Sequence, residues 1–247
     1  MKIRTDRWLT TLGLCSRSGG KDLIRAGQVR VNGRTVRDPG EMADPEADSL
    51  EVRGQAVDGR ILRHVMLHKP PGLLTAARDA RQPTVMDLLP PAYRAMGCMP
   101  VGRLDKDTTG LLLLTCDGEL NHRLLAPGRH VDKVYEARVE GLLGPAEEEA
   151  FARGLELSDF TALPARLEIL EAGRESSRAR VTVAEGKFHQ IKRMFAATGH
   201  EVLTLHRLRF GPLELDPELK EGAWRELTAE ELLRLRRAAG LEKGEDG

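Results

Sequence analysis

The sequence predicts an α+β protein in which a small N-terminal domain of two helices and short strands precedes a larger domain built on a mainly antiparallel mixed β-sheet. Two observations predict the first domain: helical spacing of apolar residues before residue 27, and the Asn32-Gly33 pair, which favours a tight hairpin turn. A third observation predicts the second domain. From about residue 64 to residue 235, short strand patterns alternate with a few helices and show no regular βαβ period.

Length and composition limit the class of protein. The 247 residues are enough for one large or two modest domains, and 40% hydrophobic residues are enough for a core. We expect a first domain over residues 1–60, a second over residues 61–240 and a flexible tail over residues 241–247. No apolar run approaches the length of about 18 residues that a membrane span needs, and the first residues lack the apolar stretch of a signal peptide. The three cysteines lack CxxC spacing, so we expect reduced thiols in a cytoplasmic protein.

Charge is segregated along a chain whose formal net charge is zero. Residues 1–37 carry nine Lys or Arg against two acids, and residues 178–210 carry seven against two. Residues 38–60 carry two Lys or Arg against seven acids, and the segment from residue 211 onward carries six Lys or Arg against ten acids. Such blocks suit a protein that meets a polyanion on chosen surfaces, although a random fluctuation of solvated charges is the alternative.

Capping residues mark the two N-terminal helices. Asp6 can cap the first helix, which Gly13 closes, and Ser16 can cap the second, which ends near Gly27. A strand pair around the Asn32-Gly33 turn completes a helix-helix-hairpin module.

Basic residues follow one side of the second helix. Arg17, Lys21 and Arg25 recur every four residues, and Arg30 and Arg34 flank the turn that follows. This arrangement predicts a surface that contacts phosphate groups.

The N-terminal segments resemble the S4 RNA-binding domain. They are R-T-D-R-W-L (4–9), G-L-C-S-R (13–17) and L-I-R-A-G-Q-V-R-V-N-G (23–33), with Thr5 and Ser18-Gly19-Gly20 departing from the usual pattern. The resemblance implies an S4-like fold for residues 1–60 and contacts with RNA from five basic residues: Arg7, Arg17, Lys21, Arg25 and Arg30. A generic helical adaptor with a surface that is basic by chance is the alternative.

Residues 102–118, G-R-L-D-K-D-T-T-G-L-L-L-L-T-C-D-G, place charged side chains beside a buried strand. The continuous apolar run from Leu111 to Leu114 predicts a strand buried on both faces. The loop before it carries Asp105 and Asp107, and carboxylates beside an apolar core persist only where they are paired or used. Asp107 precedes two threonines and can cap the turn, so we favour Asp105 for chemistry. A purely structural charged loop is the alternative.

Residues 186–199, G-K-F-H-Q-I-K-R-M-F-A-A-T-G, predict a helix. At 100° per residue, Phe188 and Ile191 share an apolar face, Lys192 lies at its border, and Arg193 points toward solvent or a bound backbone. Lys192 is therefore the expected partner of the carboxylate. A lysine that extends from the helix edge without a partner is the alternative.

Tyr135 opens an alternating segment in which it shares an apolar face with Ala137 and Val139. Aromatic residues make up 4% of the chain, too few for a wide stacking platform, but one inward-facing ring can stack on one base. A core tyrosine with a satisfied hydroxyl is the alternative.

Together these segments resemble the RsuA-type family of ribosomal RNA pseudouridine synthases, over essentially the whole chain to G-A-W-R-E-L-T-A-E-E-L (222–232). The resemblance implies that Asp105 is the catalytic aspartate, that Tyr135 is the active-site tyrosine and that Lys192 pairs with the aspartate. Segments 121–130 and 189–200 resemble the enzymes of the small-subunit rRNA more than those of the large. The implied activity is uridine isomerisation in 16S rRNA; the alternatives are a 23S rRNA enzyme and a non-catalytic rRNA-binding ribosome-assembly factor.

This isomerisation breaks the C1′–N1 bond of a uridine and rejoins the base through C5, so we expect neither a metal nor a redox cofactor. The seven histidines show no metal-ligand spacing, and no GxGxxG or P-loop motif occurs. The aspartate must stay ionised in a dry site, which requires a cation such as Lys192 beside it. A hydrolase of glycosidic bonds is a third possibility, and it would need a second carboxylate, for which Asp107 is the choice near Asp105 in sequence.

The expected partner is ribosomal RNA or an assembling small ribosomal subunit. We expect the protein to be a monomer and not to associate with a membrane. Arg103 and Arg193 are the residues of the larger domain that we expect to contact RNA, because each is a cation beside a segment that carries the chemistry.

Overall fold

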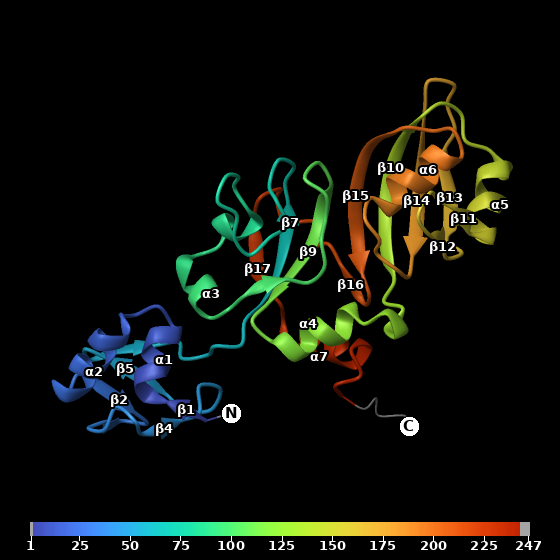
Figure 1. Ribbon diagram of the computed structural model, residues 1–247. Helices are drawn as coiled ribbons and strands as arrows, with labels where there is room; N and C mark the ends of the chain where they lie inside the picture. Colours follow the sequence, from blue (N-terminus) through green and yellow to red (C-terminus); the bar gives the residue numbers. More distant parts are fainter. Residues whose placement is uncertain (1, 243–247) are drawn as a thin grey trace. The chain divides into compact units, whose positions relative to one another are not determined.

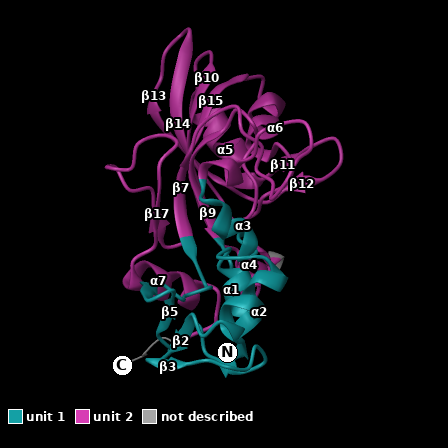
Figure 2. Cartoon of the chain, turned by 90° about the vertical axis from the view of Figure 1, so that its left-hand side faces the viewer, with its two compact units in different colours: residues 1–64, 89–99, 115–117 teal, residues 65–88, 100–114, 118–247 magenta. Residues whose placement is uncertain are grey.

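The computed structural model describes residues 2–242 (Figure 1), so residues 243–247 of the expected tail lie outside the described residues. The chain divides into two compact units (Figure 2). The first comprises Met1–His64, Leu89–Met99 and Thr115–Asp117, and the second comprises Val65–Leu88, Pro100–Leu114 and Gly118–Gly247. The first unit therefore extends past residue 60 to His64 and includes two short segments from farther along the chain.

Short helices and strands make up the first unit. They are β1 (Ile3–Arg4), α1 (Thr5–Thr11), α2 (Arg17–Arg25), β2 (Val29–Val31), β3 (Arg34–Thr35), β4 (Met42–Ala43), β5 (Leu50–Val52), β6 (Gln55–Val57) and α3 (Pro91–Ala95). One sheet has the order β3-β2-β5-β6, and β1 pairs with β4 in a second. The two helices and short strands expected near the N-terminus are confirmed.

Local signals explain how these elements begin and turn. The Ser16 side chain accepts a hydrogen bond from the Gly19 amide at 3.2 Å and so caps α2 as predicted. Asn32 and Gly33 take positive φ angles of 50° and 74° and join β2 to β3. Both predictions are confirmed.

The predicted cap of the first helix was wrong. Asp6 lies inside α1, and its carboxylate accepts hydrogen bonds from the Arg4 guanidinium at 3.0 and 2.8 Å.

The Trp8 side chain is fully buried and donates a hydrogen bond to the Gly59 carbonyl at 2.6 Å. A Cβ at Gly59 would lie 2.4 Å from the Trp8 ring, so this close approach requires glycine.

The second unit is built on a mixed sheet whose strand order is β13-β14-β10-β15-β9-β7-β17, with β16 on β15 and β8 on β9. The strands are β7 (His64–Lys69), β8 (Met99–Pro100), β9 (Thr109–Thr115), β10 (Lys133–Glu140), β13 (Arg166–Glu171), β14 (Ser176–Val183), β15 (Val202–Phe210), β16 (Leu213–Glu214) and β17 (Trp224–Glu226). A separate hairpin joins β11 (Leu155–Glu156) to β12 (Thr161–Ala162). Neighbours β10, β13, β14 and β15 run antiparallel, and β9 runs parallel to β15. The predicted mainly antiparallel mixed sheet is confirmed.

Helices cover this sheet. They are α4 (Gly118–Leu125), α5 (Pro145–Arg153), α6 (Gln190–Ala197) and α7 (Ala229–Ala238), with 3-10 turns at Val85–Leu88 and Pro127–Arg129. The rings of Phe151 on α5 and Phe195 on α6 are fully buried and lie 4.9 Å apart. Leu124 of α4 and Leu235 of α7 are buried in one cluster with Leu111 of β9. Within residues 2–242, no helix is long and apolar enough to cross a membrane.

The contact between β9 and β15 positions the loop that precedes β9. Leu111 to Leu114 are buried, as the apolar run predicts. Thr109 pairs with His206 and Gly110 with Arg207. A Cβ at Gly110 would lie 2.3 Å from the Arg207 carbonyl oxygen, and Gly110 has a φ of 101°, so glycine is needed at this crossing.

Candidate active site

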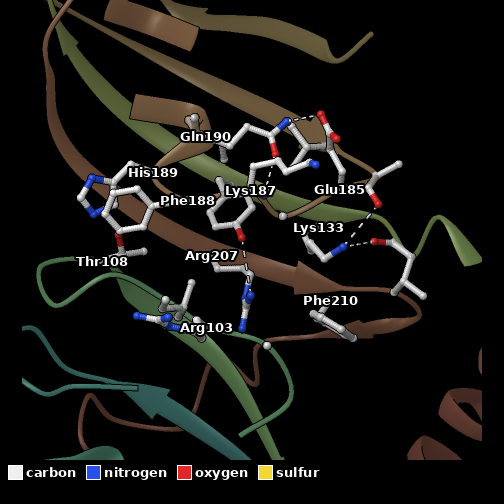
Figure 3. A pocket seen from close by; sticks show the side chains of 18 of the residues that line it. Arg103, Thr108, Lys133, Glu185, Lys187, Phe188, His189, Gln190, Arg207 and Phe210 are labelled. Carbon is white, nitrogen blue, oxygen red and sulfur yellow. Dashed lines mark hydrogen bonds between the residues drawn. The ribbon is translucent and has the colours of Figure 1, made fainter. Parts of the chain in front are cut away.

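A cavity of about 700 Å³ lies within the second unit (Figure 3). Its lining includes Asp105 and Arg103 from the loop before β9, Tyr135 from β10, Lys192 from α6 and Arg207 from β15. The three residues to which the resemblance assigns catalytic roles thus lie around one space, although 30 and 57 positions separate them along the sequence.

Asp105 stands between two nitrogen atoms. Its Oδ2 lies 3.7 Å from Lys192 Nζ, and its Oδ1 lies 3.5 Å from His189 Nε2. The side chain is 25% exposed, so water screens this carboxylate only in part. The ammonium of Lys192 at this distance attracts the carboxylate of Asp105 electrostatically.

A buried lysine holds the Asp105 loop in place. Lys69, at the end of β7, is fully buried, and its ammonium donates hydrogen bonds to the carbonyls of Pro70, Lys106 and Thr108 at 2.9, 3.3 and 3.0 Å. Burial lowers the pKa of Lys69 to about 8, and the charges of Asp107 and Asp105 oppose that shift. Lys69 therefore both shapes the loop and places positive charge near its carboxylates.

Asp107 makes the closer contact with Lys192. The ammonium of Lys192 donates to both carboxylate oxygens of Asp107, at 2.6 and 2.7 Å, and these hydrogen bonds hold the pKa of Asp107 below its usual value. The Asp107 side chain is 73% exposed and does not line the large cavity, whereas Asp105 does. The two acids of the loop therefore differ in surroundings: Asp105 faces the cavity, and Asp107 anchors the lysine from outside.

The helix that carries Lys192 starts later than predicted. It begins at Gln190, because His189 adopts a left-handed φ of 50°. The Gln190 side chain accepts a hydrogen bond from the Lys187 amide at 3.0 Å and donates one to Glu185 at 2.7 Å, which fixes the turn before the helix. The projection of Phe188 onto the apolar helix face was therefore wrong: Phe188 precedes the helix and is 69% exposed.

Tyr135 is buried at the wall of the cavity, and a buried arginine lies beside its ring. Arg207 is 1% exposed; its Nε donates to the Leu111 carbonyl at 2.6 Å, and its Nη1 lies 3.5 Å from the Tyr135 hydroxyl, at the outer limit of a hydrogen bond. Its guanidinium carbon lies 5.9 Å from the centre of the Tyr135 ring and 5.3 Å from that of Phe210. Within residues 2–242, the buried Nη2 has no hydrogen-bond partner.

Sequence reasoning missed Arg207. The alternation along β15 carried the signal, since Leu205 and Arg207 are two positions apart and both are buried. An arginine at an inward position of a strand indicates a buried charge, and such charges are rare without a role.

Lys133 is a further cation of the cavity lining. Its ammonium donates to the carbonyls of Val131 and Ala184 at 2.7 and 3.4 Å. Burial, and next the nearby charge of Arg207, lower its pKa to about 8. In the part of the chain that the structure describes, no carboxylate lies within ion-pair distance of Lys133 or Arg207. Figure 3 shows both beside Phe210, and together they make the cavity electropositive.

The predicted RNA-contacting residues fall into three groups. Arg103 is exposed at the cavity. Arg193 lies away from the cavity lining, where it pairs with Asp159, donates to Ser158 at 3.0 Å and stacks over the Phe160 ring at 4.9 Å. The five N-terminal residues, Arg7, Arg17, Lys21, Arg25 and Arg30, are all exposed on the first unit.

The arrangement suits covalent or acid-base chemistry on a polyanionic substrate. A carboxylate beside an ammonium, at an electropositive cavity with an aromatic wall, can attack an electrophilic carbon or remove a proton. Among the described residues, Glu185 is the other carboxylate of the lining, and its Oε1 already accepts hydrogen bonds from the Leu163 amide at 2.8 Å and from Gln190. That engagement does not suit a second acid of a glycosidase pair.

Fold and site together define the class of protein. The family model described as RNA pseudouridylate synthase matches residues 63–197, and the S4 domain model matches residues 3–48. The chain therefore belongs to the RNA pseudouridine synthase family, within its RsuA-type branch, and it is a pseudouridine synthase with an N-terminal S4 domain.

Particular relatives extend over nearly the whole chain. The chain is 42% identical to the ribosomal small subunit pseudouridine synthase A of Pseudomonas aeruginosa, covering 93% of this chain and 99% of the relative. It is 41% identical to the uncharacterized RNA pseudouridine synthase YtzG of Bacillus subtilis (93% and 97% covered) and 37% identical to the ribosomal small subunit pseudouridine synthase A of Escherichia coli K12 (93% and 98% covered). A crystal structure of a pseudouridylate synthase matches with a TM-score of 0.65 and 33% identity, covering 94% of this chain and 99% of that chain.

Proposed function

We propose that this protein converts a uridine of the small-subunit ribosomal RNA to pseudouridine and that Asp105 is the catalytic residue, acting as a nucleophile or as a base. The observation that carries the proposal is the Asp105 carboxylate, 3.7 Å from Lys192 Nζ, in a cavity that Tyr135 also lines. The choice of RNA rests on the relatives in Pseudomonas and Escherichia, which are named as small-subunit enzymes.

Asp105 acts as a carboxylate, and the ammonium of Lys192 lies beside it at 3.7 Å. The carboxylate either attacks a carbon of the sugar or base, or removes a proton from the sugar. By any of these routes the C1′–N1 bond breaks, the base turns and C5 bonds to C1′. The C5 proton is then lost and N1 is protonated, so the composition of the nucleotide does not change.

The rest of the lining supports the extruded nucleotide. A uridine in folded RNA has to leave its stack, at a cost of roughly a few kcal/mol, before any side chain reaches it. Tyr135 offers its ring to the uracil, and Arg207 holds that ring in place. Arg103 and Lys133 are placed to meet the backbone phosphates beside the uridine.

The two domains have different roles in this proposal. We propose that residues 1–60 bind ribosomal RNA through Arg7, Arg17, Lys21, Arg25 and Arg30, and that residues 61–240 carry out the isomerisation. Arg193, which pairs with Asp159 away from the cavity lining, contacts RNA outside the cavity. The protein acts in the cytoplasm as a monomer, on free rRNA or on an assembling subunit.

The test is a map of pseudouridines in ribosomal RNA from cells with and without this gene. The proposal expects one small-subunit position to change from pseudouridine to uridine when the gene is deleted, and to return with the wild-type gene but not with Asp105→Asn. Loss of a large-subunit position instead would contradict the choice of RNA. Restoration by Asp105→Asn would contradict the role of Asp105, and an unchanged map would favour a non-catalytic rRNA-binding factor.

A further inference from the structure

An exposed aromatic ring marks the mouth of the cavity. Phe188 lines the cavity and is 69% exposed, the highest value among the exposed large hydrophobic side chains of the described residues. Two other members of that set, Leu125 and Leu163, also line the cavity. Exposed apolar side chains that gather at one cavity mark a surface that a bound ligand covers.

Phe188 stacks on the side chain that faces Asp105. The rings of Phe188 and His189 lie 3.8 Å apart and 20° from parallel. Figure 3 shows the two side chains next to each other. The Nε2 atom of the same His189 ring lies 3.5 Å from Asp105 Oδ1. The His189 ring therefore lies between the Phe188 ring and Asp105, and it covers one face of the Phe188 ring.

The backbone holds this pair in an unusual conformation. His189 has a φ of 50°, a region that non-glycine residues rarely adopt and that the surroundings must enforce. The Gln190 side chain supplies that constraint through its hydrogen bonds with the Lys187 amide and Glu185. A hydrogen-bonded turn thus holds Phe188 in its exposed position.

The charges around Phe188 favour a nucleic acid over an apolar peptide. Lys187 precedes it in the chain and lines the same cavity, as do Arg103 and Lys192. A flat ring among cations is the combination that single-stranded nucleic acids bind, with bases on the ring and phosphates on the cations. The ring lies at the rim, whereas Tyr135 lies buried in the wall, so the two rings can contact different bases.

We propose that the free face of Phe188 stacks on the nucleobase next to the target uridine once that uridine has been extruded into the cavity. Extrusion leaves the neighbouring base without one of its stacking partners, and Phe188, backed by His189, replaces that partner. The inference rests on the proposed pseudouridine activity and adds a residue that positions the RNA. Phe188 itself takes no part in bond making or breaking.

The test uses an RNA fragment that contains the uridine mapped as above, with the fluorescent base 2-aminopurine on one side of it and then on the other. The full-length wild-type chain is compared with Phe188→Ala, with Phe188→Tyr and with Leu203→Ala. Leu203 is the matched control, because it is 49% exposed on β15 and does not line the cavity. Two quantities are measured: the single-turnover rate, from release of tritium placed on uridine C5, and the fluorescence of the bound RNA.

One stacked base corresponds to a factor of about 5 to 150 in binding, so we expect Phe188→Ala to slow single turnover at limiting protein by about that factor. Stacking quenches 2-aminopurine, so its fluorescence should rise in Phe188→Ala on one side of the uridine. Phe188→Tyr and Leu203→Ala should match the wild type in both measurements.

Equal rates and equal fluorescence for Phe188→Ala and the wild type, with the wild type active, would overturn the stacking role alone. Slower turnover in Phe188→Ala without a fluorescence change on either side would also overturn it, because the ring would then act on something other than the neighbouring base. A wild type that makes no pseudouridine in any ribosomal RNA would overturn the proposed function and this inference with it.

Discussion

Lys192 holds two carboxylates at once, Asp107 by hydrogen bonds of 2.6 and 2.7 Å and Asp105 at 3.7 Å. The nearer partner is exposed to water, which screens the attraction, and the farther partner faces the cavity. One ammonium therefore both stabilises the negative charge of Asp105 and ties α6 to the loop before β9. This arrangement gives Asp107 a structural task and leaves Asp105 open to a substrate.

Asp105→Asn should abolish isomerisation while the protein still folds and binds RNA. The amide keeps the shape of the side chain but has no charge with which to attack, so we expect turnover to fall by more than about a thousandfold. Release of tritium from uridine C5 measures turnover, and thermal unfolding and RNA titration are the controls. Turnover near that of the wild type would show that another group performs the chemistry.

The two partners of Lys192 should respond differently to substitution. Lys192→Met leaves Asp105 without its cation and should lower turnover by about a hundredfold or more. Asp107→Asn removes a carboxylate that lies outside the cavity and leaves Lys192 free for Asp105, so its turnover should stay within about tenfold of the wild type. Single-turnover rates of both variants measure this difference. A larger loss in Asp107→Asn than in Asp105→Asn would reverse the roles assigned to the two acids.

The basic side of α2 should contribute to the salt dependence of RNA binding. A variant with Arg17, Lys21 and Arg25 all changed to Gln should bind rRNA more weakly, because fewer phosphates are neutralised. The slope of log affinity against log salt should decrease by up to about 2, or about 0.7 for each phosphate that a cation no longer neutralises. Substitution is preferable to deletion, because the first unit also includes Leu89–Met99.

The control for this measurement carries three Gln substitutions at Arg153, Arg166 and Arg234, each of which pairs with a glutamate on the second unit. Its salt slope should match that of the wild type. Equal slopes for the α2 variant and the wild type would remove α2 from the RNA-binding surface.

The buried charge of Lys133 should make stability depend on pH. Its pKa is about 8 in the folded protein and 10.5 in the unfolded chain, so between these values the unfolded state binds more protons. Stability therefore rises with pH across this window, and below pH 8 the full cost of the buried charge applies. The difference in free energy of unfolding between the wild type and Lys133→Met should shift in favour of the wild type as pH rises from 8 to 10.5.

Urea unfolding at a series of pH values measures this difference, and the subtraction removes the titration of groups that both proteins share. A constant difference would mean that Lys133 has the same pKa in both states.

Local sequence patterns predicted much of the fold and part of the active site. The apolar run at Leu111 to Leu114 identifies a buried strand, and Asn32-Gly33 identifies a hairpin, because each depends on neighbouring residues alone. The family resemblance of their segments selected Asp105, Tyr135 and Lys192, and the structure places all three around one cavity.

Sequence patterns failed where side-chain hydrogen bonds or contacts between distant segments set the geometry. The 3.6-residue period placed Phe188 on a buried helix face, but the hydrogen bonds of Gln190 force a left-handed turn at His189 and expose the ring. Arg207 and Lys69 were missed for the same reason. Arg207 lies beside Tyr135, 72 positions away, and Lys69 holds carbonyls 37 and 39 positions away.

By itself, the sequence determined which segments become helices and strands and which residues can carry charge, because backbone preference and hydrophobic period act over a few residues. Only the tertiary structure decided which charged groups meet. The antiparallel pairing of β10 with β15 sets Arg207 opposite Tyr135, and the parallel pairing of β9 with β15 places the Asp105 loop at the cavity. The position of α6 determines that Lys192 touches Asp107 more closely than Asp105. Contacts of this kind depend on distances between segments far apart in the chain, and no local pattern specifies those distances.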